Sequence, residues 1–362
     1  LYTVNKHKSL ISSVYKQDRK GDVMSKEYEP QTVKELTDMV NSSLKLWGMS
    51  DEAYAKLINL SENATFCATD PKEGPNKGHS LILRVQRNDY STKDAIRSEL
   101  AWVKALADDN VISTARPIPL VTGEYVAMTT TASGDHRMIV AFEKLNGSEP
   151  TLELAGLDHW FEVVGEISAK MHNHARQWKR PEWFTRRIWD FDGIIGEHAY
   201  WGNWKNSNGL DDFGKLTVGK TVDVVKTLMD DYGENNYNFG VIHSDCRATN
   251  LLVDGSDLHV IDFDDMGFGW YLFDFAAALS FMEQSDDAVK LANAWIKGYE
   301  KVTKLSDYEK DLLPTLSIMR RIELMSWCTS HSEVPFAAKE GLQVTKDTVR
   351  LCESYLAGSY LK

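Results

Sequence analysis

Oxygen-bearing side chains that could bind a metal ion lie close together between Gly240 and Asp265. The stretch GVIHSDCRATNLLVDGSDLHVIDFDD contains Asp245, Asn250 and Asp262 beside three short apolar runs. A carboxylate and a carboxamide oxygen together suit Mg²⁺, which keeps several waters and takes one or two carboxylates alongside substrate phosphates. We therefore interpret Asn250 and Asp262 as metal ligands, and Asp245 as a residue with a separate role.

Three short strands and a hairpin are expected to position these side chains. The apolar runs are typical of buried strands at residues 239–243, 249–253 and 258–263. Asp254-Gly255 is a strong turn signal between the last two strands, so the hairpin returns Asp262 to the loop that carries the other two residues. The order His-x-Asp-x-x-x-x-Asn, followed by an apolar strand that ends in Asp, is the arrangement of kinase-type phosphoryl transfer.

The residues around Asp245 divide the expected chemistry between them. Asp245 would orient an acceptor hydroxyl and accept its proton as the bond to phosphorus forms. Arg247 would neutralise charge on the transferred phosphoryl group, and His243 would hold the loop by hydrogen bonds. Cys246 has no partnering base in the sequence for a nucleophilic role. The role of Asp264 is left open: it could be a second metal ligand or a hydrogen-bond acceptor within the loop.

A second set of candidate residues lies in the first half of the chain. A kinase-type site needs a cation on a strand to reach the nucleotide phosphates and a carboxylate on the next helix to hold that cation. Arg84 in LILRV and Glu99 in IRSELAWV fit these positions, although Lys is the usual cation. A purely structural Arg–Glu pair is the alternative. The glycine-free turn NLSENATF would cover the phosphates with backbone groups and the side chains of Ser61 or Asn63.

The remaining pattern predicts an α+β protein with two lobes. Residues 24–145 show several strand signals and a helix at 91–109, which indicates a small, mostly antiparallel N-lobe with one helix. A further helical period covers 30–47. Residues 146–150 (NGSEP) are expected to be a hinge, and 151–362 a larger, mainly α-helical C-lobe. Residues 1–23 are a candidate leader or upstream-translated segment.

A rival nucleotide motif occurs at residues 214–221. GKLTVGKT matches G-x-x-x-x-G-K-T, a phosphate-binding loop that needs a buried strand directly before it. The preceding segment is polar, and KLTVGKTVDVVKTLMDDY has apolar positions at helical spacing. We therefore expect Gly219 inside a helix, Lys220 on its solvated face, and a chance match.

The composition permits a two-lobed enzyme and argues against several partners. At 362 residues the chain exceeds the usual size of a single hydrophobic core. The net charge of −12 disfavours nucleic acid and anionic membranes as partners. The four cysteines show no C-x-x-C spacing, which is typical of free thiols in a reducing compartment. With no apolar run long enough to span a membrane, we expect a cytoplasmic protein that is a monomer or homodimer.

Taken together, these motifs resemble the aminoglycoside phosphotransferase and choline kinase superfamily, small-molecule relatives of the protein kinases. The resemblance is carried by SENATF, LILRV, RSELAWVKAL, HSDCRATN, VIDFDD and YLFDFAAAL, between about Leu60 and Met282. Within the superfamily the chain is most similar to the homoserine-kinase-type and stress-response-kinase-like branch. The resemblance implies a protein-kinase-like fold, ATP and Mg²⁺ as cofactors, and transfer to a hydroxyl. It also implies that adenine binds at the lobe junction beside Glu143 and Leu145.

The acceptor does not follow from the resemblance, so three classes of function stay open. A small-molecule kinase is preferred, because the aromatic and charged segment 181–210 would wall a small acceptor pocket. The pocket would be shaped by Trp183, Arg186, Arg187, Trp189 and Asp192. A Ser/Thr protein kinase and a catalytically weak nucleotide-binding protein are the alternatives. The C-lobe tryptophans are expected either in the core or as a cage for an acceptor ammonium group: Trp178, Trp183, Trp189, Trp201, Trp204 and Trp270.

Overall fold

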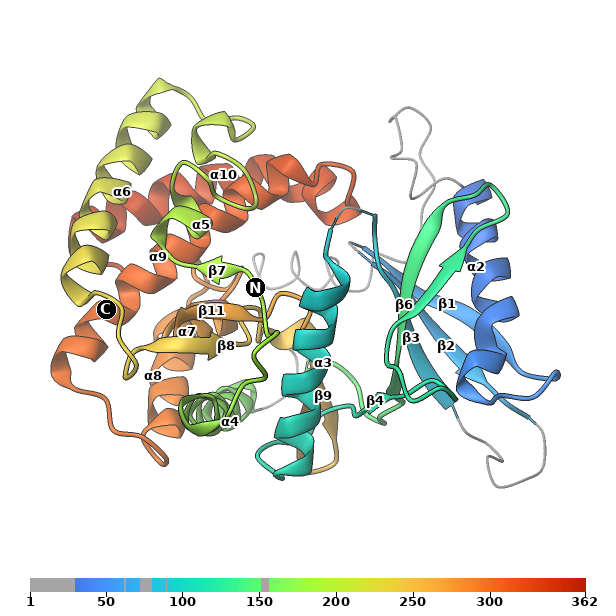
Figure 1. Cartoon of the computed structure of the whole chain (residues 1–362). Helices are drawn as coiled ribbons and strands as arrows, with labels where there is room; N and C mark the ends of the chain where they lie inside the picture. The colour runs from blue at the N-terminus through green and yellow to red at the C-terminus, as the bar shows by residue number, and fades with distance from the viewer. Residues whose placement is uncertain (1–29, 62, 72–79, 89, 151–155) are drawn as a thin grey trace.

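The chain folds into two lobes, in a computed structural model that describes residues 30–61, 63–71, 80–88, 90–150 and 156–362 (Figure 1). The candidate leader at 1–23 lies outside the described residues. The N-lobe consists of α2 (Pro30–Ser43), the 3-10 helix η3 (Leu44–Trp47), β1 (Tyr54–Leu60), β2 (Ala64–Thr69), β3 (Ser80–Val85), α3 (Lys93–Asp108), β4 (Pro117–Ile118), β5 (Ala127–Thr130) and β6 (His136–Glu143).

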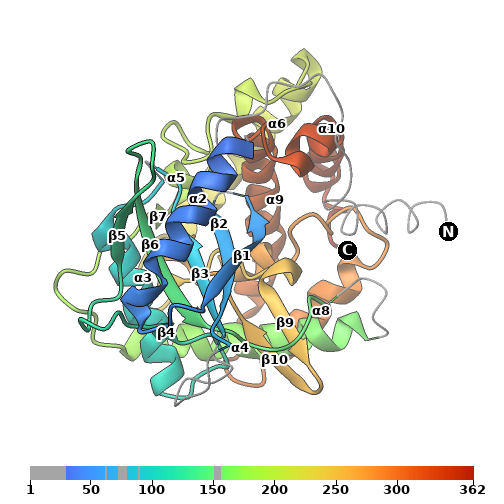
Figure 2. The same cartoon turned by 90° about the vertical axis from the view of Figure 1, so that its right-hand side faces the viewer.

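The N-lobe sheet is antiparallel throughout, in the order β1-β2-β3-β6-β4, with β5 also paired to β6. Alternate residues of β2 are buried, which is the period that gives a strand one apolar face. Phe66 and Leu83 are fully buried on that face, together with Leu36 and Val40 of α2. Helix α2 therefore covers the outer face of the sheet, as Figure 2 shows.

Helix α3 lies between the sheet and the C-lobe (Figure 1). It begins where the Thr92 side chain accepts a hydrogen bond from the Ala95 N–H. Ile96 and Leu100 pack with sheet residues, whereas Trp102 belongs to the core of the C-lobe. The lobe thus carries α3, the helix expected at 91–109, and α2, which matches the helical period expected at 30–47 and covers the outer apolar face of the sheet.

The C-lobe is mainly α-helical, as expected. Its helices are α4 (Leu157–Gln177), α5 (Phe191–Ile195), η4 (Trp204–Asn206), α6 (Asp212–Tyr232), η5 (Ala248–Asn250), α7 (Phe273–Ala278), α8 (Ala288–Tyr299), α9 (Asp307–Ser330) and α10 (Pro335–Leu356). Its strands are β7 (Ile188–Trp189), β8 (Phe239–Ile242), β9 (Leu251–Asp254), β10 (Asp257–Val260) and β11 (Gly267–Trp270). They form a β9–β10 hairpin and a small sheet in the order β7-β11-β8.

Helix α9 runs through the interior of the C-lobe. It begins at a capping box in which Ser306 and Glu309 bind each other's backbone N–H groups. Most of its residues from Leu312 to Ser326 are buried. Two of them are the arginines Arg320 and Arg321, whose burial requires carboxylate partners.

The β9–β10 hairpin turns at Gly255-Ser256, one residue later than expected, since Asp254 pairs with Asp257. Gly255 has a φ of +62°, in the left-handed region that tight turns favour. The hairpin therefore still returns the strand that precedes Asp262 to the loop before β9.

The hinge segment packs along the outer edge of this hairpin. Ser148 exchanges backbone hydrogen bonds of 3.1 and 2.8 Å with Val253. The neighbouring Gly147 has a φ of +111°, and a Cβ there would lie 2.7 Å from the Val253 carbonyl oxygen. A residue with a side chain cannot occupy this position without a shift of the backbone.

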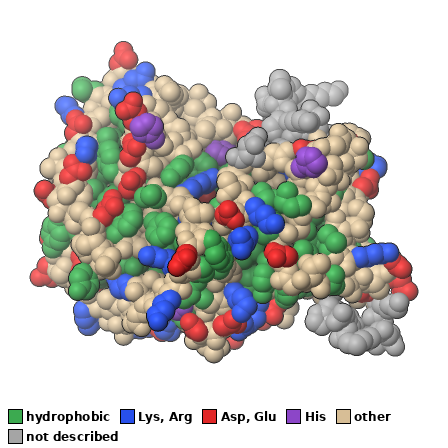
Figure 3. Space-filling model, in the orientation of Figure 1, with side chains coloured by type: hydrophobic (Ala, Val, Ile, Leu, Met, Phe, Trp, Pro, Cys, Tyr) green, Lys and Arg blue, Asp and Glu red, His purple; other side chains and the backbone are tan. Residues whose placement is uncertain are grey.

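Acidic and basic side chains are interspersed over the face of the molecule seen in Figure 3. The charge of −12 is therefore not gathered into one field on that face. Among the helices of the described segments, none is both long and apolar enough to cross a bilayer.

Candidate active site

The loop that carries Asp245 is held in place by a buried carboxylate. Asp274, at the start of α7, accepts hydrogen bonds from the N–H groups of His243 at 3.2 Å and Ser244 at 2.7 Å. Ser244 has a φ of +66°, a strained value for a residue with a side chain. His243 contacts the Ile261 carbonyl through Nε2 at 3.1 Å and the Asp245 N–H through Nδ1 at 3.3 Å. His243 thus fixes the loop, as predicted.

A buried histidine on α4 supports the same carboxylate. His172 lies 2.9 Å from Asp274 through Nε2 and 3.0 Å from the Tyr299 hydroxyl through Nδ1. Burial lowers the pKa of His172, although Asp274 opposes this shift. The neutral imidazole therefore donates to Asp274 and accepts from Tyr299, which joins three helices behind the loop.

Both carboxylate oxygens of Asp245 accept hydrogen bonds. Oδ1 accepts from Arg320 Nη2 at 2.6 Å, and Oδ2 accepts from Asn250 Nδ2 at 2.8 Å and from Arg247 Nε at 3.1 Å. Burial works to raise the pKa of Asp245, but Arg247 and Arg320 hold it below its usual value. Asp245 is therefore an oriented, ionised carboxylate, and Arg247 faces it in this structure.

Asn250 and Asp262 lie on neighbouring segments, as the spacing predicted. The Ile261 N–H donates to the Asn250 carbonyl at 3.0 Å, which brings the next residue, Asp262, beside the loop. Asp262 has a φ of +61° and a side chain that is 51% exposed. The Asn250 amide nitrogen donates to Asp245, so its side-chain oxygen is left for a cation.

The charge around Asp262 fits a divalent cation. Desolvation, together with the carboxylates of Asp264, Glu99 and Asp245, raises the pKa of Asp262 to about 7, against the effect of Arg84. A cation would relieve this repulsion between carboxylates. Within the described part of the chain, no three His, Cys, Asp or Glu side chains cluster as a metal site. A site of one carboxylate, one amide oxygen and substrate phosphates is instead what Mg²⁺ accepts.

Arg84 and Glu99 form the ion pair expected between β3 and α3. Arg84 Nη2 donates to Glu99 Oε2 at 2.6 Å, and both side chains are buried. The same guanidinium lies 3.6 Å from Asp262 and 3.5 Å from Asp264. The planar fork of Arg can face three carboxylates at once, whereas Lys presents a point charge. Arg84 thus stands directly between the N-lobe helix and the candidate metal ligand.

Asn63 contacts the C-lobe. Its amide nitrogen donates to Asp264 Oδ2 at 2.6 Å, and its oxygen accepts from the Arg87 N–H at 3.1 Å. With the Gln86 amide oxygen turned toward Arg84, Gln86 also accepts from Arg84 Nε at 2.7 Å and donates to Asn63 Oδ1 at 3.1 Å. Asp264 is therefore an acceptor for Asn63, and its other oxygen faces Arg84. Of the two roles considered for Asp264, these contacts favour the hydrogen-bond acceptor over the second metal ligand.

The other candidate nucleotide residues lie at opposite ends of the N-lobe sheet. Ser61 follows the end of β1 that pairs with Ala64, whereas Glu143 pairs with Leu81 at the start of β3. The Ser61 N–H donates to the Asn63 carbonyl at 3.1 Å, which closes the turn between β1 and β2. Glu143 ends β6 and donates its N–H to the Arg116 carbonyl at 2.9 Å. Leu145 follows outside the strand ladder, between β6 and the hinge, and is partly buried. The contacts of Glu143 and Leu145 with adenine stay predictions.

Residues of segment 181–210 that we expected to line an acceptor pocket contact other groups of the chain. Arg187 itself fills an aromatic cage, with its guanidinium carbon 4.7 Å from the ring centre of Tyr90, 4.9 Å from Trp201 and 5.5 Å from Tyr200. It also lies 3.3 Å from Asp265. Trp201, one of the tryptophans named for an ammonium cage, therefore faces a cation of the chain.

The other residues named for that pocket also have partners within the chain. Trp183 is partly exposed under Arg97, Trp189 is buried and donates to the Asp265 carbonyl at 2.7 Å, and Asp192 pairs with His198 at 2.8 Å. Four of the six tryptophans named as a possible cage are core residues: Trp189, Trp201, Trp204 and Trp270. These residues build the lobe, because their rings find neighbours within the chain.

Two arginines support the site in ways that we did not predict: Arg186, which we expected in an acceptor pocket, and Arg320, which we did not single out. Arg186 is buried and donates from Nε to the Met266 carbonyl at 2.6 Å, from Nη1 to the Ala95 carbonyl at 3.0 Å, and from Nη2 to the Asp264 carbonyl. It therefore joins α3 to the loop after Asp262. Their signal in the sequence was only that an arginine stands in an otherwise apolar or aromatic segment.

The phosphate-loop match at 214–221 is a helix, as predicted. Asp211 caps α6 by accepting from the Gly214 N–H at 2.7 Å. Gly219 lies within α6, and Lys220 is exposed. This segment has no strand before it and cannot cradle a phosphate.

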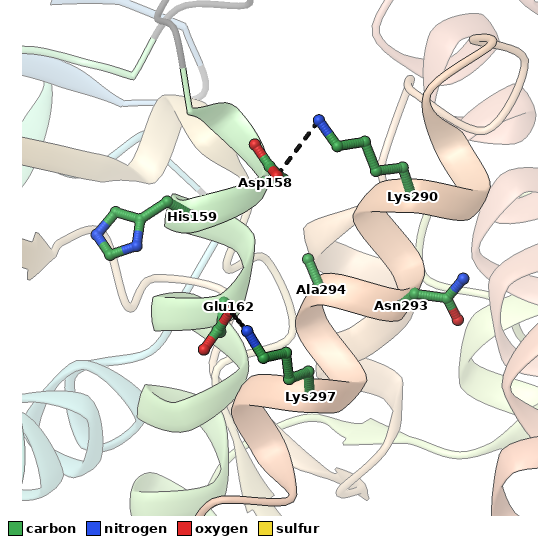
Figure 4. A pocket seen from close by; sticks show the side chains of 7 residues that line it. All are labelled: Asp158, His159, Glu162, Lys290, Asn293, Ala294 and Lys297. Carbon is green, nitrogen blue, oxygen red and sulfur yellow. Dashed lines mark hydrogen bonds and ion pairs between the residues drawn. The ribbon is translucent and has the colours of Figure 1, made fainter.

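A pocket of about 320 Å³ lies between α4 and α8, away from the motif residues (Figure 4). Its walls are charged side chains already in ion pairs: Lys290 with Asp158 at 3.3 Å and Lys297 with Glu162 at 2.6 Å. A ligand would have to displace these pairs, so we do not assign it to the chemistry.

The two lobes, with Asn250 bonded to Asp245 and Arg84 beside Asp262, have the fold of solved kinase structures. The chain belongs to the phosphotransferase enzyme family, which matches residues 56–310. This confirms the resemblance carried by the sequence motifs. The narrower placement in the homoserine-kinase-type branch stays a prediction.

Similar proteins of known name are kinases. Amicoumacin kinase of Bacillus subtilis (strain 168) is 23% identical over 200 residues, covering 55% of this chain and 56% of that protein. Hydroxylysine kinase of Mus musculus is 24% identical over 217 residues, covering 55% of each. The chain thus spans slightly more than half the length of these relatives.

Among solved structures, a microcompartment-associated aminopropanol kinase is 33% identical, with a TM-score of 0.80 over 89% of this chain and 98% of that one. An amicoumacin kinase in complex with AMP-PNP, Ca²⁺ and Ami is 17% identical, with a TM-score of 0.68 over 89% and 95% of the two chains. The second likeness establishes the fold alone.

Proposed function

We propose that this chain is an ATP- and Mg²⁺-dependent kinase that transfers the γ-phosphate to a hydroxyl of a small molecule. The observation that carries the proposal is the position of Asp245. Its carboxylate is held ionised by Arg320 and Arg247 and bonded to Asn250, beside the segment that presents Asp262. Phosphoryl transfer depends mainly on positioning and on electrostatic stabilisation, which such a fixed set of charges supplies.

In the proposed reaction each residue has a separate task. Asp245 orients the acceptor hydroxyl and takes its proton as the bond to phosphorus forms. Asn250 and Asp262 hold the Mg²⁺, which neutralises charge on the nucleotide phosphates when it is bound. Arg84, fixed by Glu99, steadies the α- and β-phosphates.

The remaining proposed contacts lie at the edges of the nucleotide. The β1–β2 turn with Ser61 and Asn63 covers the phosphates, and Glu143 and Leu145 contact adenine. Because Asn63 already binds Asp264, it would act by holding the turn against the C-lobe. Arg247 would have to leave Asp245 to contact the transferred group.

A small amino alcohol is the acceptor class that the comparisons favour. The aminopropanol kinase shares 33% identity over nearly its whole length. The relatives named for hydroxylysine and amicoumacin are more distant, at 24% and 23% identity. We therefore extend the proposal to amino alcohols first, and to hydroxylated amino acids second.

A screen of acceptors, measured as acceptor-dependent ADP release, tests the proposal. The panel contains aminopropanol, ethanolamine, choline, hydroxylysine, homoserine, a sugar and an aminoglycoside, with a generic protein substrate as the competing class. We expect turnover with an amino alcohol and background with protein. Labelling of protein serines without any small-molecule turnover would instead support a Ser/Thr protein kinase.

The role of Asp245 is tested by substitution with its amide. We expect Asp245→Asn to bind ATP as the wild type does and to lose at least about a hundredfold in kcat, as when a positioned acid–base group is removed. Asp257→Asn, an exposed hairpin carboxylate, is the matched control. Unchanged turnover in Asp245→Asn would refute the assignment.

A further inference from the structure

We propose that Arg320, on α9, is a positioning residue for the carboxylate of Asp245. The inference rests on the proposed function, because it assigns Arg320 to the step in which Asp245 orients the acceptor hydroxyl. Arg320 lies 75 residues from Asp245 in sequence and beyond residue 310, where the match to the family ends. The contribution of α9 to the site therefore comes from a part of the chain outside that match.

The geometry fixes Asp245 from one side. Arg320 Nη2 donates to Asp245 Oδ1 at 2.6 Å, while Nη1 donates to Glu323 Oε2 at 2.9 Å. Glu323 is fully buried one turn along the same helix, so it holds the guanidinium plane in one orientation. The Ser280 hydroxyl accepts from Nε at 3.3 Å. Each arm of the guanidinium thus has a separate partner.

The contact divides the two oxygens of Asp245 between different neighbours. Arg320 binds Oδ1, and Asn250 and Arg247 bind Oδ2. The carboxylate is therefore pinned at both ends and cannot rotate freely about its last bond. A base must lie within hydrogen-bond reach of the acceptor proton, and an error of about 1 Å in its position costs on the order of a hundredfold in rate.

The neighbouring Arg321 separates positioning from support of the fold. It is also buried on α9 and donates to Glu283 at 3.0 Å and to Thr348 at 3.0 Å, but it binds neither Asp245 nor its loop. The two arginines share burial, helix and an acidic partner. They differ in the one contact on which the proposal depends.

The experiment compares Arg320→Met, Arg320→Lys and Arg321→Met with the wild type, using aminopropanol or the acceptor found by the screen. We expect Arg320→Met to lose at least about thirtyfold in kcat with the KM for ATP within threefold, because the nucleotide contacts remain. A lysine can reach the carboxylate of Asp245 or that of Glu323, but not both. Arg320→Lys should therefore have a kcat between those of Arg320→Met and the wild type. Arg321→Met should keep kcat within threefold per folded molecule.

Two results would overturn the proposal. One is a kcat in Arg320→Met within threefold of the wild type. The other is an equal loss of kcat in Arg321→Met, which would mean that any buried pair on α9 matters. Arg320→Met leaves the buried carboxylate of Glu323 without its partner. If that variant does not fold, the double variant Arg320→Met/Glu323→Leu, which removes this carboxylate, is measured instead.

A second measurement keeps the inference testable even if no acceptor is found. In a double-mutant cycle of unfolding free energies, Arg320→Met and Asp245→Asn should be non-additive, since the residues are in contact. Arg321→Met and Asp245→Asn should be additive. Additivity in both cycles would refute the Arg320 contact, whereas absence of turnover in the wild type alone would refute the proposed function.

Discussion

Asn63 and Asp264, 201 residues apart in sequence, join the two lobes through a hydrogen bond of 2.6 Å between Nδ2 and Oδ2. Asn63 lies in the turn between β1 and β2, and Asp264 lies two residues after the candidate metal ligand Asp262. Both side chains are buried. The turn expected to cover the nucleotide is thus fastened to the loop expected to carry the metal.

Substitution of Asn63 by Asp should weaken this connection. The change replaces an N–H donor by a second carboxylate oxygen facing Asp264, so a buried hydrogen bond becomes a repulsion. We expect a loss of at least about 1 kcal/mol in unfolding free energy, measured by urea denaturation at pH 8. The loss should shrink at pH 4, where one of the carboxylates takes a proton. Asn59→Asp, an exposed residue of β1, is the control and should change little.

Arg84 and Lys220 should differ in their effect on nucleotide binding. Arg84 contacts Glu99 and faces Asp262, whereas Lys220 is exposed on α6. Arg84→Ala should raise the Kd for ATP at least tenfold, because a fixed cation beside the phosphates is lost. Lys220→Ala should leave it unchanged, as measured by calorimetric titration. The reverse order would make residues 214–221 the phosphate-binding element after all.

Asp262 should make ATP binding depend on Mg²⁺ and on pH. The thermal shift by Mg²⁺-ATP should exceed that by ATP with EDTA in the wild type, and the difference should vanish in Asp262→Ala but persist in Asp257→Ala. Because the carboxyl pKa is raised to about 7, the cation must displace a proton at lower pH. The Mg²⁺-specific shift should therefore grow between pH 6 and pH 8.

The same pKa predicts the stability of the metal-free protein. The folded pKa of about 7 exceeds the ordinary value of 3.8, so folded Asp262 holds a proton that the unfolded chain has lost. The contribution of this group to the unfolding free energy is present below pH 4 and declines as pH rises to about 7. The half-exposed side chain makes the effect small, and comparison with Asp262→Asn across this range isolates it.

The four cysteines should react unequally with a thiol reagent. Cys246, Cys328 and Cys352 are buried, and burial raises the pKa of each thiol, that of Cys328 and Cys352 to about 12. Cys67 is partly exposed. With Ellman's reagent, the folded protein should therefore release about one equivalent of thionitrobenzoate. The protein unfolded in guanidinium chloride should release four. Rapid labelling in Cys67→Ser would contradict the burial of the other three.

The close approach of the hinge to the hairpin should make one glycine irreplaceable. Gly147 and Gly123 both have positive φ. Of the two, only Gly147 would bring a Cβ against a neighbouring strand, at Val253 of β9. Gly147→Ala should therefore lower Tm well beyond Gly123→Ala, which serves as the control for φ alone. Equal Tm values for the two variants would show that the hinge can move away from the hairpin.

The parts of the site that lie close together in sequence could be predicted. The hairpin that returns Asp262 toward Asn250 follows from two apolar runs with a turn between them. The Arg84–Glu99 pair follows from a strand and a helix that are consecutive along the chain. Local period and turn chemistry determine such contacts, and the structure confirms that these residues meet.

The contacts between distant segments could not be predicted. Arg320 lies in a helix whose pattern is that of a buried core, and nothing local indicates that its guanidinium reaches Asp245. The aromatic residues near Arg187 could enclose either an ammonium group of a ligand or a cation of the chain itself. Such choices depend on tertiary packing, which one sequence does not specify through period or spacing.

The contacts of Arg186 bear on how the protein unfolds. Its three hydrogen bonds end on carbonyl oxygens of both lobes, and Arg187 beside it is enclosed by Tyr90 of the N-lobe and Trp201 of the C-lobe. If the N-lobe unfolded alone, Arg186 would lose its bond to the Ala95 carbonyl and Arg187 would lose the Tyr90 ring, which leaves both cations less well paired. The lobes should therefore melt as one cooperative unit, and a polypeptide divided at the hinge should yield two halves that are stable only together.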